Sequence, residues 1–214
     1  MKVIDLTHVI SEDMPVYPGT DTPKLNTANT YEKDGFKETL MIMYSHTGTH
    51  MDPPAHLYAD GATLDSMPIT SFVGKGIVVD CTDLKAGDYI TMDKINRDKP
   101  KIEEAEFILF NTGWSKYWGM KEYYGKFPVA DREVVNYLAD NKKKGFGVDV
   151  ISIDSMEEET LPSHQIVLRN NMVIIENLTN LDQVGEEIFT VCLLPLKWKN
   201  ADGSPIRAIA ILDH

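Results

Sequence analysis

Residues 45–56 read SHTGTHMDPPAH, and this segment places three of the chain's six histidines close to one aspartate. Imidazole and carboxylate groups together are typical ligands of Zn²⁺, Mn²⁺ and Fe²⁺. The segment therefore predicts a metal site held by His46, His50 and Asp52, with a fourth position left open as catalytic sites require. The alternative is a turn whose histidines are simply hydrogen-bonded. It would explain one of these side chains more easily than all of them.

The backbone expected for this segment is irregular. Gly48 and the Pro53-Pro54 pair break a helix, and no glutamate adjoins the first histidine, so the helical motif of zinc metalloproteases is excluded. Gly48 lets the chain turn tightly after a strand that ends at His46. His56 then comes close to the site without being a ligand. Its unperturbed pKa of about 6.5 suits it to general acid–base catalysis.

Short runs rich in Val and Ile flank the motif and predict strands. They lie at 2–7, 38–45, 76–81, 106–112, 148–154, 172–178, 188–196 and 205–212. One helix is predicted over 131–144, with Asp131 as its N-cap and Gly145 as its stop, and a weaker helix over about 114–124. Long apolar runs such as IFTVCLLPL favour a central sheet that is covered on both faces. A single α/β domain over 1–214 follows.

Charge and cysteine content narrow the partners and the compartment. The formal net charge is −12, from 21 basic and 33 acidic residues, which argues against nucleic acid and anionic membrane as partners. Cys81 and Cys192 stand in apolar runs and are expected to be free, buried thiols in a reducing compartment. The N-terminus does not resemble a signal peptide, and no run approaches the ~20 apolar residues of a membrane span. A cytoplasmic protein is therefore expected.

The pattern H-x-G-T-H-x-D-x-P-x-H over 46–56 resembles the signature of the cyclase family of metal-dependent hydrolases, which includes bacterial kynurenine formamidases and isatin hydrolases. Four further segments resemble the family, so the likeness covers most of the chain: IDLTHVISEDMPVYPGT, GVDVISIDS, HQIVLRNNMVIIENLTNLDQV and LPLKWKNADGSPIRAIAIL. The resemblance implies a compact α/β domain, the swivelling β/β/α fold, in which helices flank a central β-barrel-like sheet. It also implies a homodimer or homotetramer.

The resemblance further implies roles for individual residues. The family's first metal is held at the positions of the three ligands named above, and its catalytic acid–base stands at that of His56. In the formamidase branch, Asp52 also bridges to a second zinc, which a later histidine and a glutamate twelve residues beyond it complete. His164 and Glu176 stand in that relation here. Glu176 ends the apolar run MVIIE, a costly place for a carboxylate unless it is paired or binds a cation, and an exposed strand-end acid is the alternative.

The expected reaction is hydrolysis of an amide or formamide C–N bond in a small molecule, by metal-activated water with His56 transferring the protons. N-formylkynurenine is the first substrate to consider, on one or two Zn²⁺ ions per chain. Opening of a cyclic amide such as isatin on one Mn²⁺ ion is the sibling alternative. A metal-dependent binding protein without turnover and a module that the metal merely staples are the non-enzymatic alternatives. His56 argues against the first and chain length against the second.

Aromatic side chains supply the candidates for substrate contacts. Trp114 opens an aromatic group in TGWSKYWG that can stack on an aromatic substrate, although filling the core or a subunit interface is an equally good use of it. Only the family resemblance suggests that Tyr17 lies near the site. His8 and His214 each stand alone near a terminus, so a surface role is expected for both.

Overall fold

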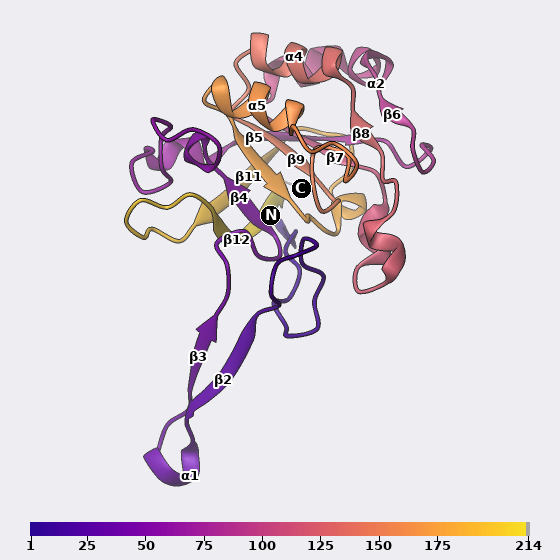
Figure 1. Ribbon diagram of the computed structural model, residues 1–214. Coiled ribbons are helices and arrows are strands. Elements are labelled where there is room, and N and C mark those ends of the chain that lie inside the picture. The colour runs from indigo at the N-terminus through magenta and orange to yellow at the C-terminus, as the bar shows by residue number, and fades with distance from the viewer. Residues whose placement is uncertain (213–214) are drawn as a thin grey trace.

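Eight strands form the central sheet of the computed structural model, which describes residues 1–212 and leaves His214 outside. They are β1 (Lys2–Asp5), β4 (His50–Asp52), β5 (Val73–Asp80), β7 (Phe107–Asn111), β9 (Gly145–Val148), β10 (Val173–Glu176), β11 (Phe189–Pro195) and β12 (Ser204–Leu212). Their order is β1-β12-β11-β5-β7-β9-β10-β4, and β4 also pairs with β12, so seven of them close into a barrel (Figure 1). β5, β7, β9 and β10 run parallel and the other pairings are antiparallel, which confirms the expected barrel-like mixed sheet.

Side chains alternate between two cores along the central strands. In β7 all five residues are buried. Phe107 and Leu109 belong to the core inside the barrel, whereas Ile108 and Phe110 belong to the core between the barrel and the helices. Because successive strand residues point to opposite faces, an unbroken apolar run needs cover on both sides. The prediction of a sheet covered on both faces is confirmed.

Helices gather over the outer face of the parallel strands (Figure 1). They are α2 (Met92–Arg97), α3 (Lys99–Glu104), α4 (Arg132–Asp140) and α5 (Pro162–Arg169). Short elements complete the body: η1 (Pro54–His56), η2 (Ile69–Ser71), η3 (Trp114–Tyr117), η4 (Lys121–Tyr124), η5 (Leu181–Gln183) and the parallel pair β6 (Tyr89–Ile90) and β8 (Val129–Ala130). Within residues 1–212, no helix is both long and apolar enough to span a membrane.

The helix predicted over 131–144 is shorter than expected. Asp131 caps it as predicted, because its side chain accepts a hydrogen bond from the main-chain N–H of Val134. The helix ends at Asp140, and Lys142 has a left-handed φ of 52°. Lys143 then turns inward, where its ammonium donates to three carbonyl oxygens at the end of α3. Capping a neighbouring helix is the reason that this lysine leaves its own.

Two other boundaries differ from the prediction. The strand predicted over 148–154 ends at Val148, and the following residues are irregular. Buried Asp149 there accepts hydrogen bonds from Thr112 and from the main-chain N–H of Trp114. The weak helix over 114–124 is two short 3-10 turns, η3 and η4. Helix α5 was not predicted.

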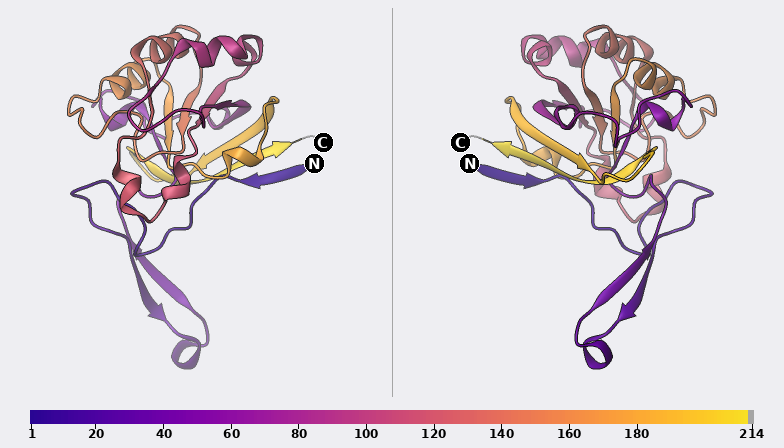
Figure 2. Two further views of the ribbon diagram at one scale, coloured as in Figure 1. Left: turned by 90° about the vertical axis from the view of Figure 1, so that its right-hand side faces the viewer. Right: turned by 90° about the vertical axis from the view of Figure 1, so that its left-hand side faces the viewer.

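A hairpin projects from the body of the protein (Figures 1 and 2). It consists of β2 (Lys24–Asn29) and β3 (Glu38–Ile42), with α1 (Tyr31–Asp34) at its tip. We call residues 24–42 the arm, and none of them is buried.

Both cysteines are free thiols, as predicted. Cys81 is buried, and burial raises the pKa of its thiol to about 12. Cys192 is only partly buried, because it faces away from the barrel core on β11.

Candidate metal centre

The histidine motif passes through β4, whose residues alternate in direction. Met51 is fully buried inside the barrel, so His50 and Asp52 point to its outer face. In the antiparallel pairing with β10, Glu176 stands opposite His50. Directly opposed residues share a face of the sheet. Strand pairing therefore brings Glu176 to a motif more than a hundred residues away.

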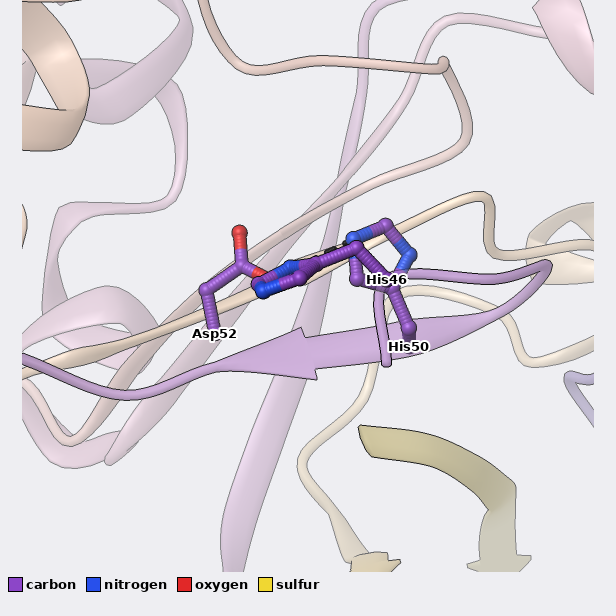
Figure 3. A group of neighbouring side chains, drawn as sticks. All are labelled: His46, His50 and Asp52. Atoms are coloured by element: carbon purple, nitrogen blue, oxygen red, sulfur yellow. Dashed lines mark hydrogen bonds and ion pairs between the residues drawn. The ribbon is translucent and has the colours of Figure 1, made fainter. Parts of the chain in front are cut away.

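His46, His50 and Asp52 form the first donor group, and Figure 3 shows their side chains converging over β4. Nδ1 of His46 lies 2.7 Å and Nε2 of His50 lies 3.2 Å from the same oxygen, Oδ1 of Asp52. Gly48 makes this approach possible, because its φ of 63° turns the chain between the two histidines.

Asp52, His164 and Glu176 form the second donor group. Oδ2 of Asp52 faces Nε2 of His164 at 3.9 Å, and Oε1 of Glu176 lies 3.4 Å from the same nitrogen. Glu176 is 5% exposed, which excludes the alternative of an acid in solvent at a strand end. The two oxygens of Asp52 thus face different groups, so this carboxylate is shared between them.

Two of the histidines are oriented through the ring nitrogen that faces away from the donors. Nδ1 of His50 lies 2.8 Å from the carbonyl oxygen of Gly48, and Nδ1 of His164 lies 2.7 Å from Oδ2 of Asp154. Asp154 also accepts the main-chain N–H groups of Ser163 and His164 at the start of α5. Nε2 of each histidine is left facing carboxylates, which is the usual arrangement around a bound metal.

The ionisation of these groups shows that the cluster suits a cation. Burial by itself lowers the pKa of His50 and of His164, but neighbouring carboxylates outweigh it and raise the two values to about 9 and about 10. Burial favours a higher pKa for Asp52, yet His50 and His46 hold it well below its ordinary range. Nε2 of His46 is buried without a hydrogen-bond partner. Positive charge is favoured here, and imidazoles with carboxylates fit a divalent metal ion.

His56 lies beside the two groups, on η1, without joining either. Its ring centroid is 4.0 Å from that of His46 and 6.2 Å from that of His164. Burial lowers the pKa of His56, although the carboxylate of Asp52 opposes the shift. A lowered pKa keeps the imidazole neutral at pH 7, the form that accepts a proton. Its position and its ionisation suit the proton transfer predicted for it.

A cavity of about 400 Å³ opens over the donors. Apolar side chains, among them Val16, Ile151 and Leu161, share its lining with the donors. Tyr17 also belongs to the lining, where the resemblance places it. Apolar walls with a few convergent polar groups are typical of sites for small organic molecules.

Trp114 lies outside the lining of this cavity. Its indole packs edge-on against Tyr117 and Phe127, and Nε1 donates a hydrogen bond to the carbonyl oxygen of Tyr123. This placement lends no support to the prediction that Trp114 contacts the substrate. The aromatic group is partly buried and packs against the core, which agrees with the alternative use of it.

Three residues around the donors were not predicted. Oδ2 of Asp202 lies 3.6 Å from Nε2 of His46 and also lines the cavity. A Cβ on Gly203 would come within 2.5 Å of the His46 ring, so only glycine fits there. In the sequence, ADGSPI has the composition of an ordinary turn and gives no such signal. Asp154, which ends the run VDVISID, was visible as a carboxylate after a strand.

His8 packs against Trp118, so the surface role expected for it is wrong. The two rings are stacked, with centroids 3.9 Å apart and planes 5° apart. Nε2 of His8 is buried without a hydrogen-bond partner, and its main-chain N–H donates to Oγ1 of Thr49. The indole of Trp118, which is distant in the sequence, shields His8 from solvent.

Burial lowers the pKa of His8 from 6.5 to about 4, so this residue makes folding pH-dependent. The unfolded chain takes up the proton first, so the contribution is complete above pH 6.5 and is lost as pH falls toward 4. We expect acidification to lower the free energy of unfolding of the wild type by about 1 kcal/mol more than that of His8→Phe, after allowance for partial exposure. Urea melts across this range measure the difference, and equal losses would contradict the prediction.

Comparisons with known proteins agree with this architecture. The family model described as "Putative cyclase" matches residues 4–155. A kynurenine formamidase of Erythrobacter litoralis is 31% identical over 209 residues, covering 97% of this chain and 93% of that protein. The kynurenine formamidase of Bacillus anthracis is 29% identical over 210 residues, covering 97% and 96%. Isatin hydrolase A from Labrenzia aggregata superposes with a TM-score of 0.90 at 25% identity, covering 100% of this chain and 94% of that one.

The barrel, the two donor groups and these similarities together define the class of protein. It is a metal-dependent hydrolase that acts on amide C–N bonds. The chain belongs to the cyclase family, since the family match covers most of its length and a relative exceeds 30% identity over nearly all of it.

Proposed function

We propose that this hydrolase is an arylformamidase that removes the formyl group of N-formylkynurenine, with two Zn²⁺ ions per chain. The observation that carries the proposal is that two donor groups share Asp52. His164 and Glu176 supply the second group, and both are buried. The similarity to kynurenine formamidases of two organisms supports a formamide as the bond that is cleaved. Mixed imidazole and carboxylate ligands suit zinc.

The cavity fits such a substrate. Its volume of about 400 Å³ lies within the range of small-molecule sites. The donors can receive the formamide, while Val16, Tyr17 and Leu161 offer apolar surface to an aromatic ring. Leu161 has a left-handed φ of 50°, a strained conformation for this residue type, and it directly precedes α5, which carries His164.

Bound metal would acidify a water molecule for attack at neutral pH and offset the charge that develops on the carbonyl oxygen. Residues of the chain perform the other tasks. Neutral His56 accepts a proton and returns it to the leaving arylamine nitrogen. Asp154 holds the ring of His164 in one orientation through its 2.7 Å contact with Nδ1.

The proposal is tested by elemental analysis and N-formylkynurenine hydrolysis on the same protein sample. We expect two zinc ions per chain, and turnover that chelation removes and added zinc restores. No tightly bound metal under any loading condition would overturn the proposal at its centre. Two zinc ions per chain without formamide hydrolysis would contradict only the proposed substrate.

Opening of a cyclic amide on a single Mn²⁺ ion is the second candidate. The isatin hydrolase superposition at a TM-score of 0.90 favours it. One manganese per chain, together with isatin hydrolysis, would select this candidate. If wild type and His56→Ala handled every amide equally poorly, a binding protein without turnover would replace both.

We further propose that the enzyme is a cytoplasmic homodimer in which the arm packs against the second copy. An isolated two-stranded ribbon is marginally stable by itself, yet no residue of the arm is buried against the described part of the chain. Its exposed apolar side chains are Tyr31, Phe36, Leu40, Met41 and Ile42. Exposed apolar surface of this kind marks interfaces, and twofold dimers are the commonest assemblies. Tyr44, just past the arm, lines the cavity, so dimer contacts there would help to close it.

Charged residues on one face of β3 should separate the dimer. Leu40 and Ile42 are two residues apart and share that face. We expect light scattering to give the wild type about twice the chain mass of 24.1 kDa and the variant Leu40→Glu/Ile42→Glu the chain mass itself. The control is Ile69→Glu, an exposed apolar residue of the body, which should keep the wild-type mass. An arm variant with the wild-type mass would rule out this interface.

A further inference from the structure

We infer that Asn177 is a positioning residue for the metal ligand His50. The inference rests on the proposed role of the first donor group, and it adds a residue that acts on the metal site through the His50 ring. Asn177 follows Glu176 directly, at the end of β10, and is buried. Its side-chain amide fixes the carbonyl group that orients the His50 ring.

The carbonyl oxygen of Gly48 receives two hydrogen bonds. Nδ2 of Asn177 donates one at 2.8 Å, and Nδ1 of His50 donates the other at 2.8 Å. A proton on Nδ1 leaves Nε2 of the neutral ring as the free ligand atom. Nε2 is also the atom that faces the carboxylates of Asp52 and Glu176, at 3.2 Å and 3.4 Å. Holding the carbonyl in place therefore selects the tautomer that binds a metal.

The conformation of Asn177 explains why this residue type occupies the position. Its φ is 57°, in the left-handed region where asparagine is tolerated far better than most residues. Its main-chain N–H donates to Val150, and its carbonyl oxygen accepts from Oγ1 of Thr49. The residue is thus held at its backbone and its side chain alike. One turn places both the Glu176 carboxylate and the Asn177 amide against the motif.

Tyr123 determines which end of the amide faces Gly48. Its hydroxyl donates to Oδ1 of Asn177 at 2.8 Å, which directs Nδ2 toward the Gly48 carbonyl. The Tyr123 side chain is fully buried, and burial raises the pKa of its hydroxyl well above the ordinary value, so it stays a donor. A buried hydroxyl without a hydrogen-bond partner is costly, and Asn177 supplies the acceptor that the Tyr123 hydroxyl needs.

The substitution Asn177→Gly removes the amide but keeps the left-handed backbone, which glycine adopts freely. The matched control is Asn171→Gly, because Asn171 has the same conformation, with φ 58°, but is exposed. Both are made in a His164→Ala background, which disables the second donor group and leaves one site to titrate. Zn²⁺ affinity is measured by competition with a chromophoric chelator, and thermal melts of the metal-free proteins report folding.

We expect Asn177→Gly to weaken Zn²⁺ binding by about 10- to 100-fold, the usual effect of losing such an outer partner, with Asn171→Gly unchanged. Tyr123→Phe should weaken it less, because it only frees the amide to turn. Zn²⁺ affinity equal to that of the background would overturn the inference. If Asn177→Gly does not fold, Tyr123→Phe decides in its place by the same criterion. A His164→Ala background that binds no zinc would instead overturn the first donor group and the proposed function with it.

Discussion

The substitution Asp52→Asn is expected to abolish metal binding and hydrolysis together. Oδ1 of Asp52 faces the first donor group and Oδ2 faces the second, so one uncharged amide disables both. The substitution keeps the shape of the side chain, so the fold should remain. We expect metal content to fall below one ion per chain and turnover to fall by more than about a thousandfold, since the metal's contribution is lost. Elemental analysis and steady-state kinetics measure the two effects.

Two other substitutions serve as controls for Asp52→Asn. Glu176→Gln removes a carboxylate donor of the second group and leaves all three donors of the first group in place, so it should keep one metal ion per chain. Asp149→Asn removes another buried carboxylate, one that holds the loop at Thr112 instead of the donors, so it should lower stability and keep both ions. Metal content of Asp52→Asn equal to that of Glu176→Gln would show that Asp52 is not shared.

The substitution His56→Gln should have nearly as large an effect on turnover and none on metal content. His56 belongs to neither donor group, and its neutral imidazole is placed beside both. Loss of a general acid–base typically costs about 10²- to 10⁴-fold, and here it should appear in kcat instead of KM. Kinetics and elemental analysis on one sample separate this result from that of Asp52→Asn.

A His56→Gln variant that retains wild-type kcat would remove His56 from the chemistry. Loss of metal in the same variant would make His56 a ligand. A matched control is His8→Gln, which alters another half-buried histidine that is stacked on Trp118. It should leave kcat and metal content unchanged.

The central part of the site was predictable because it lies in one short segment. A tight turn is enough to bring His46, His50 and Asp52 together, and the glycine at position 48 predicts that turn. The same is not true of Glu176, which reaches the motif through the pairing of β10 with β4. Periodicity predicts strands but not which strands are neighbours, so this ligand depended on the family resemblance. Asn177 acts through a hydrogen bond to Gly48 and Gly203 through its closeness to the His46 ring, and a local sequence pattern predicts neither contact.

The wrong predictions share a physical cause, which is competition from tertiary contacts. The helix at 131–144 was extended too far because Lys143 caps α3 instead of continuing its own helix. The strand at 148–154 was misplaced because Asp149 binds the neighbouring loop. In both cases a polar side chain bonds to the main chain of residues that are distant in the sequence.

The closure of the barrel has a consequence for proteins deprived of metal. β4 meets β12 at two residue pairs and β10 at three, whereas β11 and β12 share six. The pairing of β4 with β12 is therefore the shortest in the barrel, and His50 takes part in both pairings of β4. A cation bound between the β4 donors and Glu176 would hold β4 and β10 together. In the metal-free protein, β4 should separate from its neighbours at residues 50–52 while the parallel strands stay paired, so limited proteolysis should make its first cut there.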